Sequence, residues 1–232
     1  MSGGRLLFVG CGPGAADLLT LRAVDAIGRA DVVIWSATQI DRRVLAEHMR
    51  PGAEVVAWPP ATQHEILAVY ERAAAENLLV VRLKGGDPTL FGGLEPDLTA
   101  ARERGLACQI VPGVGALSAA AAALGCEVAT TAHPLLLVDA SGGADAGPAA
   151  ATAIAVHGAG VAPRALQDDL LRRGLPASTP CVVAIEVSRR DETLVECALE
   201  ELAETVEDMA RGVLSVVLAG PSTTVRSAPA RS

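Results

Sequence analysis

Short apolar runs alternate with longer amphipathic segments through the first half of the chain. The runs predict buried β-strands, and the segments, with apolar residues about every three to four positions, predict helices packed on a sheet. The expected strands are residues 6–9, 31–35, 54–58, 78–83 and 108–111. The expected helices are residues 17–29, a short helix ending at 46–49, 62–76 and 94–103. Such alternation predicts a mostly parallel sheet covered by helices.

The second half has a different pattern and predicts a second domain. Pro112-Gly113-Val114-Gly115 interrupts the chain, and we expect domains at residues 1–113 and 114–232. Expected strands are residues 135–138, 153–156, 181–187 and 214–219, and expected helices are 116–124, 165–173 and 194–207. The Gly/Ala-rich residues 141–151 predict a surface loop, and the segment after Pro221 predicts a frayed tail.

The most informative stretch is Lys84-Gly-Gly-Asp-Pro-Thr-Leu-Phe-Gly92, which directly follows the expected strand 78–83. Ligands of open α/β sheets bind at the carboxyl ends of the strands. Gly85 and Gly86 allow close approach of the backbone to a ligand, or a positive φ. Asp87 can accept hydrogen bonds from backbone N–H groups or from ligand hydroxyls. A plain strand-to-helix turn capped by Asp87 explains the residues equally well.

Composition excludes several classes of function. The formal net charge is −8, which argues against nucleic acid as a main partner, because phosphate binding needs a basic surface. Five cysteines without a C-x-x-C pair predict a reduced, cytoplasmic protein. The four histidines have no metal-ligand spacing, so we expect no metal. No apolar run is long enough to predict a membrane span.

The first loop, Gly10-Cys11-Gly12-Pro13-Gly14, is unlike a dinucleotide-binding loop. Its third glycine comes one residue early for G-x-G-x-x-G, and Pro13 lacks the N–H that a pyrophosphate would need. Cys11 has two interpretations: a thiol near a helix start, or a small buried apolar residue, which we favour. A tight turn that opens the backbone to a ligand fits the loop best.

Three segments in order resemble the tetrapyrrole (corrin/porphyrin) methyltransferases, the class III S-adenosylmethionine enzymes. The first is Phe8–Gly14 together with residues 17–21, the second is Gly85-Gly86-Asp87-Pro88, and the third is Val111-Pro112-Gly113-Val114. Asp31-Val32-Val33 is similar to the second strand of the family. The match is good over residues 5–130 and weaker beyond.

The resemblance implies two α/β domains with a cofactor cleft between them, S-adenosylmethionine as cofactor and a homodimer. It implies methyl transfer to an electron-rich carbon of a small-molecule tetrapyrrole. The cofactor-binding residues that it implies are Gly85, Gly86, Asp87, Leu90, Gly115, Ala116, His157 and Val187. Gly10, Gly12, Pro13 and Gly14 would line the tetrapyrrole side. No catalytic side chain is implied.

Two branches of the family share features with this chain. A short chain that ends soon after a final Gly-Pro is similar to precorrin-4 C(11)-methyltransferase, the branch that we favour, in cobalamin synthesis. Leu83-Lys84-Gly85 is more similar to the uroporphyrinogen-III methyltransferases, although Gly93 replaces their Arg. A non-catalytic descendant that binds a tetrapyrrole or the cofactor is a third hypothesis.

A polycarboxylate substrate and an acidic protein together predict a local cationic cluster. The cations near the expected cleft are Lys84, beside the glycine turn, and Arg42 and Arg43, after the second strand. We expect these three residues on the substrate side, with a solvated surface role as the alternative for each.

Overall fold

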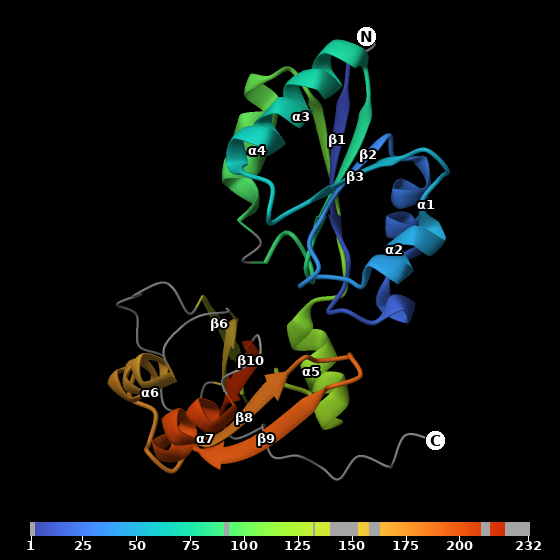
Figure 1. Ribbon diagram of the computed structural model, residues 1–232. Coiled ribbons are helices and arrows are strands. Elements are labelled where there is room, and N and C mark those ends of the chain that lie inside the picture. Colours follow the sequence, from blue (N-terminus) through green and yellow to red (C-terminus); the bar gives the residue numbers. More distant parts are fainter. Residues whose placement is uncertain are drawn as a thin grey trace. The chain divides into compact units, whose positions relative to one another are not determined.

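The computed structural model describes residues 3–90, 93–131, 133–139, 153–157, 163–209 and 214–220. The chain divides into two compact units, residues 1–115 and 116–232, so the boundary lies two residues after the one expected from the sequence. Each unit is a β-sheet with helices (Figure 1). None of the helices in the described ranges is long and apolar enough to cross a bilayer.

The first unit contains a parallel five-stranded sheet in the order β3-β2-β4-β1-β5. Its strands are β1 (Arg5–Gly10), β2 (Val32–Trp35), β3 (Glu54–Ala57), β4 (Leu79–Lys84) and β5 (Ala107–Val111). Its helices are η1 (Ala16–Leu18), α1 (Leu21–Arg29), α2 (Arg42–His48), α3 (Gln63–Glu76) and α4 (Leu94–Glu103). The parallel sheet and its alternation with helices confirm the expectation from the apolar pattern.

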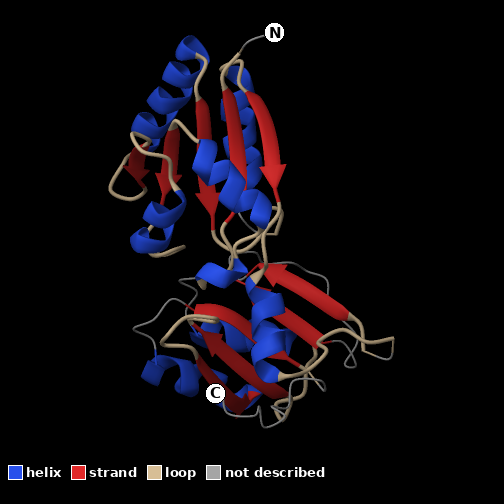
Figure 2. Cartoon of the chain, turned by 90° about the vertical axis from the view of Figure 1, so that its right-hand side faces the viewer, coloured by secondary structure: helices blue, strands red, loops and turns tan. Residues whose placement is uncertain are grey.

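Two apolar layers cover the two faces of this sheet. One layer joins the strands to α1 and α2 through residues such as Val9, Val81 and Ile27, all fully buried. The other joins them to α3 and α4 through residues such as Phe8, Val80 and Tyr70. Because side chains alternate along a strand, β4 places Val81 and Leu83 on the first face, and Val80 and its alternate neighbours on the second. Helices flank the strands of this sheet (Figure 2).

Local signals place the helix ends in the first unit. Thr62 caps α3, and its side chain and that of Glu65 form a reciprocal capping box. Thr20 caps α1 by accepting a hydrogen bond from the Ala23 N–H at 3.1 Å. The helix expected at 17–29 therefore begins at Leu21, and a short 3₁₀ turn precedes it.

The second unit contains a mixed sheet in the order β6-β7-β10-β8-β9. Its strands are β6 (Leu135–Asp139), β7 (Ala153–His157), β8 (Pro180–Ile185), β9 (Thr193–Ala198) and β10 (Leu214–Ala219). Its helices are α5 (Ala116–Leu124), α6 (Pro163–Arg172), η2 (Leu199–Glu201) and α7 (Leu202–Met209). Only β6 and β7 pair in parallel among these strands, and α5 packs on one face while α6 and α7 pack on the other.

The helix expected at residues 194–207 is wrong in its first part, because Thr193–Ala198 forms β9. This segment pairs antiparallel with β8, and Cys181 lies opposite Cys197. Leu194 packs on one face of the sheet and Cys197 on the other, which is the period of two that a strand requires. The helical period begins only at Leu199. The loop expected at 141–151 and the tail lie outside the described residues.

Candidate functional site

Three loops meet at the carboxyl edge of the first sheet. The strands β4, β1 and β5 are neighbours, so the loops that follow them lie side by side: residues 85–90, 11–15 and 112–115. These are the three segments that carry the family resemblance. This edge is where open α/β sheets bind ligands.

Backbone hydrogen bonds join the first two loops directly. The Gly86 N–H donates to the Gly12 carbonyl at 2.7 Å, and the Gly12 N–H donates to the Gly86 carbonyl at 3.3 Å. The Cys11 N–H donates to the Lys84 carbonyl at 2.9 Å, and the Cys11 side chain is fully buried, which confirms it as a small buried residue. The predicted cofactor loop and the predicted substrate loop are therefore one hydrogen-bonded unit.

Glycine is required where these loops cross. A Cβ on Gly113 would lie 2.3 Å from the Gly86 carbonyl oxygen, and one on Gly10 would lie 2.6 Å from the Gly113 nitrogen. Both neighbours are backbone atoms and cannot move aside as a side chain would. Gly86 itself has a φ of 62°, the left-handed region that glycine adopts without strain.

The Asp87 carboxylate ties the loop after β4 to the loop after β5. One oxygen accepts from the Thr89 N–H at 2.8 Å and from the Thr89 hydroxyl at 2.7 Å. The other accepts from the Gly113 N–H at 3.3 Å. Since a carboxylate oxygen has two lone pairs, this second oxygen can still accept one hydrogen bond. Asp87 thus shapes the turn and keeps one acceptor position for a ligand.

Three further residues predicted for the cofactor, Gly85, Leu90 and Gly115, lie in the first unit. Gly85 is exposed, and a Cβ on Gly115 would meet nothing within 4 Å, so both leave open space beside the crossing loops. Leu90 is an apolar side chain with 46% of its surface exposed. Open backbone and an exposed apolar side chain fit an adenosine-containing cofactor.

Three predicted cofactor residues belong to the second unit. Ala116 begins α5, and its half-buried side chain packs on the core of that unit. His157 is the last residue of β7, and its backbone pairs with Val216. Val187 is buried in the core that α5 covers, between Glu186 and Ser188, which both have positive φ. Val187 is 1% exposed, so the described residues give a ligand no access to it.

The three predicted substrate cations lie in contrasting environments. Arg42 and Arg43 begin α2, and both are exposed. The side chain of Arg43 is 90% exposed and pairs with Asp41 at 3.4 Å. Lys84 instead is 12% exposed and contacts Asp97 of α4, with 2.6 Å between Nζ and Oδ2. The described contacts do not place these three cations in one cluster.

The structure reveals a charged cluster that the sequence pattern did not single out. Arg82 is 7% exposed, and it donates to Asp97 at 2.8 Å and to the Tyr70 hydroxyl at 2.7 Å. Its guanidinium also lies 5.9 Å from the centre of the Trp58 ring. Burial raises the pKa of Tyr70 to about 12, so this hydroxyl keeps its proton. We call Arg82, Lys84 and Asp97 the buried charge cluster.

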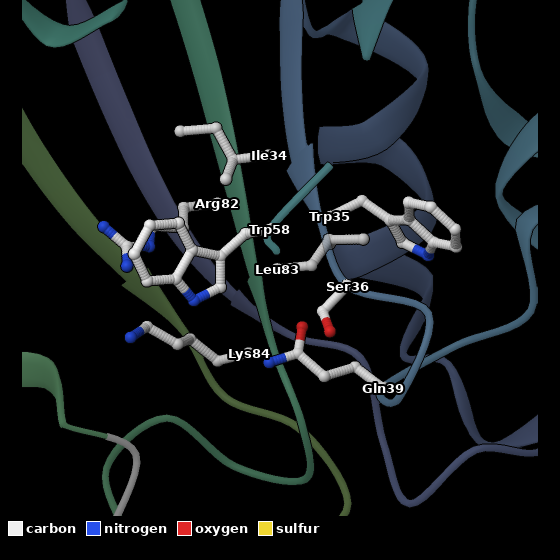
Figure 3. A pocket seen from close by; sticks show the side chains of 8 residues that line it. All are labelled: Ile34, Trp35, Ser36, Gln39, Trp58, Arg82, Leu83 and Lys84. Carbon is white, nitrogen blue, oxygen red and sulfur yellow. The ribbon is translucent and has the colours of Figure 1, made fainter. Parts of the chain in front are cut away.

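A small cavity of ≈ 60 Å³ lies beside this cluster, at the ends of β2 and β4 (Figure 3). Residues of β2 and β4, and of the segments that follow β2 and β3, line it: Ile34, Trp35, Ser36, Gln39, Trp58, Arg82, Leu83 and Lys84. Burial lowers the pKa of Lys84 below its ordinary 10.5, Arg82 lowers it further, and the hydrogen bond with Asp97 acts in the opposite direction.

Two signals in the sequence point to this cluster. Val80, Arg82 and Lys84 occupy alternate positions of a strand, so two cations share one face of an apolar run, and buried cations need partners. The chain also has 19 Lys and Arg residues, and Lys84 is its only lysine. Asp97 carries no such signal, because its contact with the cations depends on how α4 packs.

Metal and thiol chemistry find no support in the part of the chain that the structure describes. It contains no group of three His, Cys, Asp or Glu side chains able to hold a metal ion. Burial raises the pKa of Cys181 to about 12 and that of Cys108 and Cys197 above the ordinary 9.0, so these thiols stay protonated at neutral pH.

Comparison with known proteins decides the family. The family model of the tetrapyrrole (corrin/porphyrin) methylases matches residues 5–203. The chain belongs to this family. It is 33% identical to a precorrin-4 C(11)-methyltransferase of Sinorhizobium sp, over 92% of this chain and 88% of that protein.

Solved structures of the tetrapyrrole methylases have the same architecture. A cobalt precorrin-4 methyltransferase matches with a TM-score of 0.80 and 25% identity, over 93% of this chain and 94% of the other. A uroporphyrin-III C-methyltransferase from Thermus thermophilus, complexed with S-adenosylhomocysteine, matches with a TM-score of 0.75 and 30% identity, over 94% and 97%. The two-domain α/β class expected from the sequence is confirmed.

Proposed function

We propose that this tetrapyrrole methylase transfers a methyl group from S-adenosylmethionine to a ring carbon of a tetrapyrrole, with precorrin-4 at C-11 as its substrate, in cobalamin synthesis. The observation that carries the proposal is the close backbone approach of Gly10, Gly86 and Gly113, which we call the glycine crossing. It lies at the carboxyl edge of the first sheet and is formed by the three segments of the family resemblance. The similarity to a precorrin-4 methyltransferase over nearly the whole chain favours this substrate.

The residues present fit S-adenosylmethionine. Gly85 and Gly115 offer open backbone, Leu90 offers an exposed apolar side chain, and one Asp87 oxygen can accept a further hydrogen bond. Ala116, His157 and Val187 complete the proposed set from the second unit. When bound, the cofactor supplies a methyl group that its sulfonium already activates, so the protein contributes alignment and exclusion of water.

Gly10, Gly12, Pro13 and Gly14 form the substrate side of this proposal. Their loop is hydrogen-bonded to the cofactor loop at Gly86, which would hold the two reactants at a fixed spacing. The activity needs no nucleophilic side chain, because the carbon of the tetrapyrrole is the nucleophile.

Uroporphyrinogen III is the second candidate substrate. Leu83-Lys84-Gly85 resembles that branch of the family, and the Thermus thermophilus enzyme matches at 30% identity. The candidates differ in product: precorrin-4 would gain a methyl group at C-11, and uroporphyrinogen III at C-2 and C-7.

Incubation with isotopically methyl-labelled S-adenosylmethionine and each candidate tetrapyrrole tests the function. We expect label in precorrin-4, located at C-11 by NMR after mass spectrometry. Label in uroporphyrinogen III alone would favour the second candidate. Label in neither tetrapyrrole, with cofactor binding intact, would favour a non-catalytic binding protein.

The proposal includes a cytoplasmic homodimer. None of the five cysteines forms a disulfide bond, which fits a reducing compartment. A two-fold dimer is the most common closed assembly. Light scattering should give about twice the 23.6 kDa mass of the chain, and a monomer mass at micromolar concentrations would refute the dimer.

A further inference from the structure

The cavity beside the buried charge cluster is separate from the glycine crossing, although β4 lines the cavity and also leads into a loop of the crossing. The crossing uses the loops after β4, β1 and β5, whereas the cavity lies at the ends of β3, β2 and β4. Lys84 is the last residue of β4, and Gly85 begins the cofactor loop. A Cβ on Gly85 would lie 3.5 Å from Cγ of Gln39, a lining residue, so the two regions adjoin.

The buried charge cluster carries one net positive charge. Arg82 and Lys84 contribute two cations, and Asp97 contributes a carboxylate that both of them contact. All three side chains are at most 12% exposed. Charges removed from water need compensation, so a net positive cluster beside a cavity favours an anionic ligand.

Neutral donors surround the same cavity. Figure 3 shows the Trp58 ring, the Lys84 chain and the Gln39 amide grouped at the end of β4, whereas the Trp35 ring points away. The Trp35 indole N–H is already used, since it donates to the Ile40 carbonyl at 2.8 Å. An ammonium, an indole N–H and an amide all donate hydrogen bonds, and a carboxylate only accepts them.

The size of the cavity limits what enters it. At ≈ 60 Å³ it is far smaller than the roughly 300–1,000 Å³ of clefts that enclose whole drug-sized ligands. A tetrapyrrole ring does not fit, and neither does a complete cofactor. One functional group at the end of a flexible side chain does fit.

Resting on the proposed function, we infer that this cavity receives a carboxylate side chain of the tetrapyrrole, with Lys84 as its ion-pair partner. Asp97 is a positioning residue because it contacts Lys84, and Arg82 is one because it contacts Asp97 and adds the second positive charge of the cluster. Trp58 and Gln39 border the carboxylate. The methionyl carboxylate of the cofactor has the same chemistry. We assign the cavity to the tetrapyrrole because the cofactor loop is hydrogen-bonded at Gly86 and Asp87 to the loops after β1 and β5, which lie on the side of β4 opposite to β2 and β3.

Binding to Lys84→Met tests the inference. The probes are uroporphyrin III, a stable porphyrin whose side chains all end in carboxylates, and S-adenosylhomocysteine. Loss of one charged hydrogen bond should weaken porphyrin binding by about tenfold to a hundredfold. S-adenosylhomocysteine binding should change less than about twofold. Arg82 and Asp97 remain paired in this variant, which leaves the cluster neutral.

Three further variants separate the carboxylate contact from general effects. Lys84→Arg keeps the charge and should retain most of the porphyrin affinity. Trp58→Phe removes the indole N–H, keeps an aromatic ring beside Arg82 and keeps all three charges of the cluster, so it should weaken porphyrin binding about threefold even if Lys84→Met folds poorly. Arg29→Met removes an equal charge at an exposed site at the end of α1 and should have no effect.

Each outcome is decisive. Porphyrin affinity lost in Lys84→Met but kept in Arg29→Met supports the inference. Unchanged porphyrin affinity in both Lys84→Met and Trp58→Phe overturns it and leaves the proposed function standing. Loss of S-adenosylhomocysteine affinity alone would assign the cavity to the cofactor and also overturn it. A wild-type protein that binds neither ligand would refute the proposed function as well.

Discussion

The two halves of the carboxyl edge of the first sheet are built in opposite ways. At the glycine crossing, backbone meets backbone and no side chain fits between Gly86 and Gly113. At the buried charge cluster, side chains make the contacts, and the sheet supplies only their positions. A side chain added at the crossing should therefore disrupt its backbone contacts, whereas removal of a charged side chain should disrupt the cluster. One short segment, residues 84–87, belongs to both.

The largest effect on stability should come from Asp97→Asn. Two buried cations would lose their shared carboxylate, and removal of one partner from a buried ion pair costs about 3–5 kcal/mol. Urea unfolding measures this loss. The matched control is Asp41→Asn, at the exposed pair with Arg43, which should leave the midpoint unchanged. Similar midpoints for the two variants would show that the cluster contributes little.

Gly113→Ala should have the next largest effect. The added methyl group would lie 2.3 Å from the Gly86 carbonyl oxygen, and overpacking of this kind typically costs about 1–3 kcal/mol. It should also abolish S-adenosylhomocysteine binding, because the cofactor loop must move. Calorimetry on the folded variant checks the binding.

Gly115→Ala is the control for that change, since its methyl group meets nothing within 4 Å. Its stability should equal that of the wild type. If Gly113→Ala bound S-adenosylhomocysteine as tightly as Gly115→Ala, the crossing would not be part of the cofactor site.

The pH dependence of stability should distinguish Lys84 from an exposed lysine. Because burial and Arg82 lower its pKa below 10.5, the folded protein releases this proton at a lower pH than the unfolded chain. The unfolded state then binds more protons, so the free energy of unfolding should rise with pH in the window just below 10.5, relative to Lys84→Met. Asp97, Arg82 and the neighbouring Tyr70 are the titratable groups around it. Parallel pH profiles for both proteins would contradict this pKa direction.

The smallest effect should come from the exposed arginines. Arg42→Ala with Arg43→Ala should weaken tetrapyrrole binding by less than Lys84→Met does, and more than it weakens cofactor binding. The loss should disappear as salt screens these solvated charges, whereas the Lys84 contribution should persist because the contact is buried. Titration at two ionic strengths checks both statements. Equal losses for the two ligands would remove this pair from the substrate side.

The sequence predicts the glycine crossing far better than the charge cluster. The sequence shows glycines directly after the expected strands. The carboxyl ends of parallel strands lie at one edge of the sheet, so these glycines are expected to lie near one another. Asp97 meets Arg82 and Lys84 only because α4 packs on the same face as the alternate residues of β4, which is tertiary information.

The second unit shows the same limit. Residues 194–198 were expected to be part of a helix over 194–207, yet pairing with β8 makes them a strand. Strand pairing depends on the partner and overrides such local patterns. The fold class of the chain and the strands of the first sheet follow from periodicity, whereas this edge strand does not.

The central claim is that the tetrapyrrole binds beside the cofactor at this edge, with one of its carboxylates at the buried charge cluster. A calorimetric titration of uroporphyrin III into protein saturated with S-adenosylhomocysteine tests it most directly. Porphyrin should bind with nearly the affinity that it has for the free protein, and S-adenosylhomocysteine should stay bound. Displacement of S-adenosylhomocysteine by the porphyrin would show that both ligands use one place, and would contradict the account.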